Sequence, residues 1–148
     1  MSDARIEARG VVNDSPRAVA SGGVLTAVRP LDLELGSGSL TVITGRSGSG
    51  KSTLLSMLAG MLAPTSGTVL LDGANLYSLD ERSRSRLRNA KIGLVPQGHT
   101  ALRALSVLDN VLLPSVLYSR LRPPRQRAES LLEAVGMARF ARTNPWEL

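Results

Sequence analysis

The sequence predicts an α/β fold in which short strands alternate with helices. Leu40–Thr44 is an apolar run rich in β-branched residues, which is typical of a buried strand. A glycine-rich loop follows this run, and a helical pattern of apolar residues begins at Lys51. From Val107 onward the pattern is helical alone, so a helical region follows the alternating part.

The first part of the chain predicts two further strands. Residues 4–12 predict a short strand with apolar side chains at even-numbered positions, which lie on one face of a strand. These side chains are Ile6, Ala8 and Val12. Residues 13–23 are rich in small and polar residues and predict a loop. Leu31–Leu35 alternates strictly between apolar and acidic residues, which indicates a half-buried strand.

The remaining elements follow the glycine loop in order. They are a helix over 51–62, a strand over 68–71 with a turn at 72–73, a helix over 79–88, a strand over 92–95, and helices over 107–113 and 125–135. Gly136 directly follows the last helix, where glycine commonly caps a helix C-terminus.

Length and composition exclude several classes of protein. A chain of 148 residues is long enough for one ordinary domain. A hydrophobic fraction of 43% excludes a disordered chain, and the scarcity of aromatics means that aliphatic residues build the core. The absence of cysteine excludes disulfides, and a single histidine argues against a zinc enzyme.

The net charge of +6 arises wholly from residues 75–148, because basic and acidic side chains balance in residues 1–74. A basic half is compatible with nucleic acid or a membrane surface. We favour a solvated basic face and disfavour nucleic acid, because no aromatics are interleaved with the arginines as a stacking platform.

No apolar targeting segment is visible at the N-terminus. Ser52–Leu71 carries no charge and is long enough for a membrane helix, but the turn residues Ala63–Gly67 divide it. We therefore expect a helix, a turn and a strand in a soluble protein.

The segment Gly45–Ser52 matches the phosphate-binding pattern G-x-x-x-x-G-K-[ST] between a predicted strand and a predicted helix. Glycines let the backbone curl around phosphate oxygens, and the helix start adds unpaired N–H groups and a positive dipole end. Lys51 supplies a point charge, and the Ser52 hydroxyl is a ligand for Mg²⁺. The predicted nucleotide-binding residues are Gly45, Arg46, Ser47, Gly48, Ser49, Gly50, Lys51, Ser52 and Thr53.

A phosphate-binding loop alone does not name a function. A GTPase would carry an N-K-x-D motif, and none occurs. The arginines at 82, 84, 86 and 88 resemble the lid of a small nucleoside kinase, but they follow the loop too soon.

Several segments downstream narrow the choice. They are Lys51–Gly60, Pro64–Val69, Leu71–Gly73, Ile92–Gln97, Leu105–Val111 and Pro145–Leu148. In order and spacing they resemble the ATP-binding subunit of ABC transporters. Asn110–Pro114 is most similar to the branch that serves lipoprotein release and macrolide-type export.

The resemblance implies a P-loop NTPase core with an antiparallel β-subdomain over residues 1–97 and a partial helical subdomain over 98–148. It places Gln97 at the Q-loop glutamine, which would bind Mg²⁺ together with Ser52. It also implies ATP, a membrane permease partner, a homo- or heterodimer of ATPase domains, and a peripheral location on the cytoplasmic face of the cell membrane. Residues 102–117 would lie near the permease, although a plain core role fits them equally well.

The chain departs from the family pattern in two respects. Residues 1–44 contain no aromatic to stack on adenine, so we expect weaker or less base-selective binding, with Val11 or Val12 as an apolar substitute. The signature motif, the Walker B aspartate and the catalytic glutamate would come after Leu148. Asp72, Asp109 and His99 do not fit those roles in register.

These departures predict a domain that is incomplete at its C-terminus, exposes apolar surface and has marginal stability. Whether this chain is an enzyme stays open, and we expect negligible ATP hydrolysis by it alone. The alternatives are a non-enzymatic module that binds nucleotide or permease, and a non-functional remnant of a gene.

Overall fold

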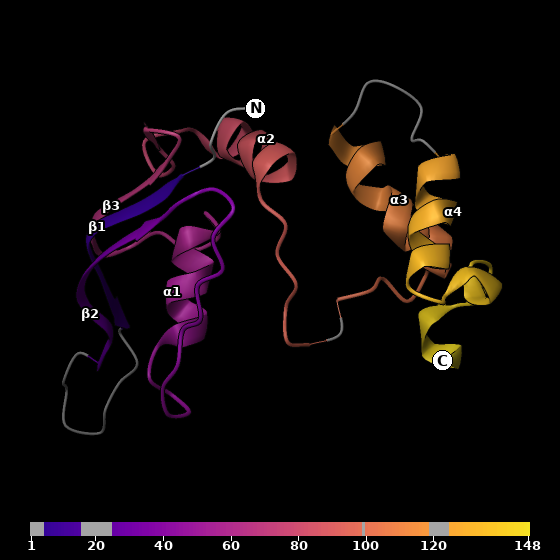
Figure 1. Cartoon of the computed structure of the whole chain (residues 1–148), viewed down its shortest axis with the longest axis horizontal. Coiled ribbons are helices and arrows are strands. Elements are labelled where there is room, and N and C mark those ends of the chain that lie inside the picture. Colours follow the sequence, from indigo (N-terminus) through magenta and orange to yellow (C-terminus); the bar gives the residue numbers. More distant parts are fainter. Residues whose placement is uncertain (1–4, 16–24, 99, 119–124) are drawn as a thin grey trace. The chain divides into compact units, whose positions relative to one another are not determined.

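The computed structural model describes residues 5–15, 25–98, 100–118 and 125–148 (Figure 1). These residues form two compact units that divide between Gly93 and Leu94, and each unit is described by itself. The sequence predicted subdomains over 1–97 and 98–148, and that division stays a prediction.

The N-terminal unit contains an antiparallel sheet with the strand order β2-β1-β3-β4. Its strands are β1 (Ile6–Ser15), β2 (Leu25–Leu35), β3 (Ser66–Leu71) and β4 (Ala74–Asn75). β2 lies at one edge, where the missing N–H of Pro30 is tolerated. The predicted α/β class and antiparallel sheet are therefore present, with β4 as an element that the sequence did not indicate.

Because β1 contains a bulge, the prediction of which of its side chains face the core was partly wrong. The pairing with β2 shifts register between Ala8 and Val11, and Gly10 between them has a φ of +56°. The extra residue turns Val11 into the core, with 0% of its surface exposed, while Val12 is only half-buried. The predicted loop over 13–23 was also wrong at its start, because pairing with β2 continues to Ser15.

Helix α1 (Lys51–Leu58) packs on this sheet and carries the centre of the core. Met57 is fully buried, and Leu54 and Leu58 lie beside it among side chains of β1 and β3. The helix ends earlier than the predicted residue 62, because Gly60 turns the chain with a φ of +70°. The core is aliphatic, as the composition predicts.

Helix α2 (Glu81–Lys91) follows the hairpin of β3 and β4. Its N-cap is Asp80, whose carboxylate accepts a hydrogen bond of 2.9 Å from the backbone N–H of Ser83. The predicted helix over 79–88 is thus displaced by two residues at its start, where the aspartate cap sets the boundary.

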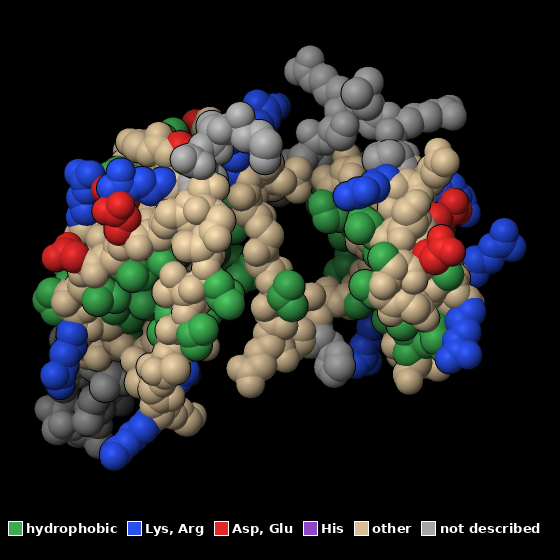
Figure 2. Space-filling model, viewed as in Figure 1, with side chains coloured by type: hydrophobic (Ala, Val, Ile, Leu, Met, Phe, Trp, Pro, Cys, Tyr) green, Lys and Arg blue, Asp and Glu red, His purple; other side chains and the backbone are tan. Residues whose placement is uncertain are grey.

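Two predicted strands are absent. Residues 40–44 and 92–95 form no ladder with any residue in the fully described stretch 25–98. Leu40 and Val42 are 92% and 73% exposed, and Val95 is 94% exposed. A buried strand needs hydrogen-bonding neighbours on both edges, and these runs have none here. The expected exposure of apolar surface is confirmed, and hydrophobic side chains reach the surface of the N-terminal unit (Figure 2).

The C-terminal unit contains the helices α3 (Val107–Tyr118) and α4 (Arg125–Ala134) and two short 3₁₀ helices, η1 (Ala138–Phe140) and η2 (Pro145–Glu147). Leu108, Ala128 and Leu132 form its core. α3 continues past Pro114, although the sequence predicted an end at residue 113. A proline inside a helix removes one hydrogen bond but leaves the following turn intact.

Gly136 caps α4 as predicted. It has a φ of +72°, and the N–H groups of Gly136 and Met137 donate to the carbonyls of Glu133 and Leu132 at 2.9 and 2.7 Å. Met137 also packs against the core cluster of this unit. None of the helices in the described stretches is long and apolar enough to cross a membrane.

Candidate nucleotide-binding site

The predicted phosphate-binding loop leads directly into α1. Gly50 is the N-cap of the helix with a φ of +87°, and its carbonyl accepts the first helical hydrogen bond from the N–H of Leu54 at 2.8 Å. A side-chain carbon at this position would collide with the carbonyl group of Ala27 in β2. The site therefore requires glycine here both for its backbone angle and for its contact with the sheet.

The start of α1 presents hydrogen-bond donors with no competing anion. The N–H groups of Lys51, Ser52 and Thr53 lie in the first turn, where a helix offers them no acceptor of its own. The first turn contains no acidic residue. These donors and the positive end of the helix dipole are thus available to an external anion.

The ammonium group of Lys51 folds back onto the loop. Its Nζ donates hydrogen bonds to the carbonyl oxygens of Gly45 at 2.9 Å and Arg46 at 2.7 Å, and Oγ of Ser49 lies at 3.4 Å. The Ser49 N–H closes a turn onto the Arg46 carbonyl at 3.2 Å. Lys51 forms no ion pair with any carboxylate in the described part of the chain, so no such group neutralises its charge.

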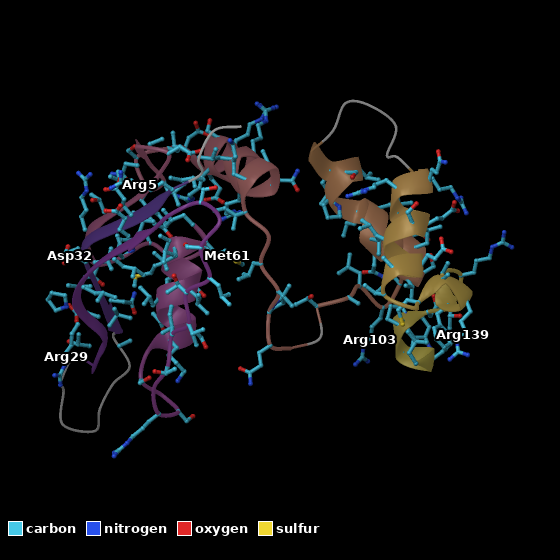
Figure 3. All side chains as sticks on the ribbon, in the orientation of Figure 1. Arg5, Arg29, Asp32, Met61, Arg103 and Arg139 are labelled. Carbon is cyan, nitrogen blue, oxygen red and sulfur yellow. The ribbon has the colours of Figure 1, made fainter. Side chains whose placement is uncertain are left out.

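Two hollows adjoin the loop and share several of its residues. The smaller, of about 170 Å³, is lined by Ala27 and Gly48–Thr53. The larger, of about 510 Å³, is lined by Thr26–Leu31 of β2, Ile43, Thr44, Gly48–Lys51 and Leu54. The basic lining residues are Lys51 and Arg29, which extends from β2 (Figure 3), and the lining residues include no carboxylate. The surroundings of the loop therefore favour an anionic ligand.

The structure brings the predicted residues Gly45–Thr53 together in one loop and helix start within the N-terminal unit. Gln97 belongs to the C-terminal unit, where it is exposed, and its role as a Mg²⁺ ligand stays a prediction. Val11 is fully buried in the core, so it is not available as the apolar substitute for an adenine-stacking aromatic. His99 lies outside the described residues.

The aspartates that do not fit a catalytic register have structural roles. Asp72 lies in the turn between β3 and β4, accepts a hydrogen bond of 2.9 Å from the N–H of Arg5 and pairs with Lys91 at 3.6 Å. Asp109 accepts a hydrogen bond of 2.6 Å from the Ser106 hydroxyl at the start of α3. Both carboxylates are thus committed to local structure.

The sequence did not indicate the contribution of β2 to this site. Ala27 lines both hollows and lies against Gly50, although 23 positions separate them in the chain. An alanine in a strand carries no local signal for this role, since only the tertiary fold brings it to the loop.

The residues present fit a polyphosphate with a magnesium ion. Gly50 permits the close contact of the loop with Ala27, and hydroxyl groups of Ser52 and Thr53 lie at the helix start. The described residues contain no cluster of three metal-binding side chains. A hydroxyl oxygen such as that of Ser52 is the kind of protein ligand that Mg²⁺ takes beside phosphate oxygens and waters.

Comparison with known proteins gives the family. The family model described as ABC transporter matches residues 28–147, so this chain belongs to the ABC transporter family. The resemblance to ABC transporter ATP-binding subunits that the sequence motifs predicted is confirmed, and the similar proteins include lipoprotein-releasing system ATP-binding proteins named LolD.

LolD of Buchnera aphidicola subsp. Schizaphis graminum is 35% identical over 125 residues, which cover 84% of this chain and 55% of that protein. LolD of Pseudomonas fluorescens is 45% identical over 120 residues, which cover 80% and 52%. The chain thus spans about half the length of these relatives.

Solved structures support the same fold. The dimeric structure of MJ0796, a bacterial ABC transporter cassette, matches with a TM-score of 0.85 and 30% identity, over 97% of this chain and 62% of that one. A second dimeric structure, of a post-hydrolysis state of the MJ0796 cassette bound to ADP and Pi, matches with the same values. The predicted fold class, an α/β P-loop core with an antiparallel subdomain, is therefore confirmed.

Proposed function

We propose that this chain binds ATP through the loop Gly45–Ser52 and the first turn of α1, as the ATP-binding component of an ABC transporter. The observation that carries this proposal is the unneutralised ammonium of Lys51 beside uncontested N–H donors at a helix start. The names of the LolD relatives and the ADP-bound neighbour support the choice of an adenine nucleotide.

The first three residues of α1 and Gln97 have separate roles in this proposal. The N–H groups of Lys51, Ser52 and Thr53 bind phosphate oxygens, and the Lys51 ammonium moves from loop carbonyls to the terminal phosphates. Ser52 Oγ and Gln97 Oε1 are the proposed protein ligands of Mg²⁺. When bound, that ion neutralises charge on the phosphate groups.

The proposed partners are a membrane permease and a second ATPase domain. The relatives named as parts of a lipoprotein-releasing system support the permease, and the dimeric MJ0796 structures support the second domain. With such a partner the protein would lie at the cytoplasmic face of the cell membrane. In this role ATP binding and hydrolysis drive transport through the permease.

A second candidate function is nucleotide binding without hydrolysis. The hollows beside the loop have no acidic lining residue, so the described site offers no carboxylate to orient an attacking water. The 148-residue chain alone is accordingly expected to retain ATP without turning it over.

Substitution of the two lysines tests the proposal, because Lys51 and Lys91 are the only lysines in the sequence. Lys51→Ala is expected to weaken binding of Mg²⁺–ATP about tenfold or more, since hydrogen bonds to charged groups contribute about 1.5–3 kcal/mol. Lys91→Ala removes a partner of Asp72 far from the loop in sequence and is expected to bind as the unmodified chain does. Titration calorimetry measures both, and unchanged ATP binding by Lys51→Ala would contradict the proposal.

A further inference from the structure

Helix α1 is too short to hold its own position. It has eight residues, and isolated helices of this length are unstable in water. Its last turn contains no basic residue to interact with the negative end of the dipole. The carbonyl groups of Ser56 and Met57 at this end accept bonds from the N–H groups of Gly60, Met61 and Leu62, and side chains from elsewhere in the fold add further donors.

Tyr77 supplies one donor. Its hydroxyl oxygen lies 2.7 Å from the carbonyl oxygen of Met57, in the last turn, and 2.5 Å from that of Leu62, beyond the helix. A phenol has one proton, so it donates to one of these carbonyls at a time. The half-buried ring thus holds the helix end together with the segment that follows it.

Arg88 supplies the second donor, from α2. One guanidinium nitrogen donates to the carbonyl oxygen of Gly60 at 2.7 Å, and the other donates to Ser85 Oγ at 2.9 Å and lies 3.6 Å from a Glu81 carboxylate oxygen. The side chain passes so close to Gly60 that a Cβ there would lie 3.3 Å from its Cδ. A fixed cation at a helix C-terminus stabilises the helix dipole.

Arg84 contacts Tyr77 and Glu81, and these contacts do not involve α1. Its guanidinium carbon lies 5.3 Å from the centre of the Tyr77 ring, and the group pairs with Glu81. Arg84 and Arg88 therefore occupy the inner face of α2, whereas Arg82 and Arg86 are exposed.

We infer that Tyr77 and Arg88, named here the α1 clamp, are positioning residues for nucleotide binding. The inference rests on the proposed function. The phosphate-binding N–H groups lie at one end of α1 and the α1 clamp holds the other end, about 12 Å away along a rigid helix. Residues 36–50 before the helix form no helix or strand, so the helix start is held by a few tertiary contacts such as that of Gly50 with Ala27.

The test compares ATP affinity in matched variants. Arg88→Met and Tyr77→Phe keep the apolar volume of each side chain and remove its donor. Both are expected to weaken Mg²⁺–ATP binding about three- to tenfold, which lies within the range of coupling carried through packed networks. Arg82→Met removes an exposed arginine from the same helix and is expected to leave affinity unchanged, and Arg88→Lys is expected to restore part of it.

Affinity is measured by calorimetry at a temperature where urea unfolding shows every variant to be folded. Lower stability with unchanged affinity in Arg88→Met and Tyr77→Phe would overturn the inference. If the unmodified chain failed to bind ATP, the proposed function itself would fail, and the two failures are thereby distinguished.

Hydrogen exchange in the unmodified chain keeps the inference testable if both variants unfold. Coupling between sites is reciprocal, so ATP should slow exchange of the amides of Gly60, Met61 and Leu62. The N–H groups of Gly60, Met61 and Leu62 donate to carbonyls of Met57 and Ser56 in the last turn of α1. Exchange unaffected by saturating ATP at these amides would contradict the inference.

Discussion

Gly50 and Ala27 are in direct backbone contact: a Cβ built on Gly50 would stand 2.1 Å from the carbonyl oxygen of Ala27. We predict that Gly50→Ala destabilises the chain and abolishes ATP binding, because the loop must leave β2 to relieve this collision. Gly48→Ala is a matched control, with a φ of +77° and no atom within 4 Å of its Cβ. It is expected to cost only about 1–2 kcal/mol from its left-handed backbone.

Urea unfolding and ATP titration of both glycine variants check this prediction. Equal losses for Gly50→Ala and Gly48→Ala would show that backbone angle alone, and not the contact with β2, makes glycine necessary at the helix start.

The stability of the N-terminal unit should fall in strong alkali through Tyr77. Burial raises the pKa of this phenol from 10 to about 12, opposed by the nearby charges of Arg84 and Arg88. Below about pH 10 the phenol is protonated in both the folded and the unfolded chain, and its contribution is fully present. Between about pH 10 and pH 12 the unfolded chain loses its proton first, so stability declines.

Comparison with Tyr77→Phe isolates this effect, because the variant has no proton to lose at that position. Urea unfolding at several pH values is expected to show the unmodified chain approaching the variant in stability as the pH rises above about 10. A constant difference between the two chains would refute the assignment.

Asn110 is expected to stabilise the C-terminal unit through its side chain. The amide oxygen accepts from the Leu102 N–H at 2.7 Å, and the two hydrogens of the amide nitrogen are shared among the carbonyls of Leu102, Leu105 and Ser106 at 3.1, 3.2 and 2.9 Å. We predict that Asn110→Ala destabilises this unit by about 1–3 kcal/mol, the cost of leaving such groups unpaired.

The fluorescence of Trp146, the only tryptophan of the sequence, reports unfolding of this unit. Asn110→Asp keeps an acceptor for the Leu102 N–H but has no amide donors, so an intermediate loss is expected. A midpoint of unfolding unchanged by either substitution would be inconsistent with this role.

The exposed run after β2 should limit solubility. Leu40 and Val42 are 92% and 73% exposed on a segment without ladder partners. We predict that the double variant Leu40→Thr, Val42→Thr remains dispersed at higher concentration, with stability changed by no more than about 0.5 kcal/mol. Light scattering over a concentration series measures the first effect and urea unfolding the second.

A buried position provides the control for this prediction. Val69→Thr places a hydroxyl at a site with 0% exposure and is expected to destabilise the chain by about 1–3 kcal/mol. If the exposed double variant lost as much stability as Val69→Thr, the run 40–44 would have to be packed in solution.

Local chemistry explains which parts of the fold the sequence predicted. The glycines, lysine and hydroxyl residues of Gly45–Thr53 act within one loop and one turn of helix, so their spacing alone indicates the site. Gly136 likewise caps α4 through bonds to residues three to five positions away. In both cases the residues whose interactions define the structure are close together in the sequence.

Long-range contacts explain the rest. The bulge at Gly10 moves Val11 rather than Val12 into the core, and no local pattern shows the extra residue. The roles of Ala27 and Tyr77 depend on segments 23 and 20 residues away, Gly50 and Met57. Leu40–Thr44 has the composition of a buried strand, but a strand forms only where neighbours satisfy its backbone.

The Lys51 ammonium is a cation that contacts the carbonyl oxygens of the phosphate-binding loop. Because the ammonium binds the Gly45 and Arg46 carbonyls, the curled backbone does not have to wait for a phosphate to draw it together. For the proposed binding of a phosphate, the Lys51 side chain would only have to exchange these carbonyl partners for phosphate oxygens. Preorganisation of this kind lowers the entropic cost of association, since few backbone angles remain to be fixed.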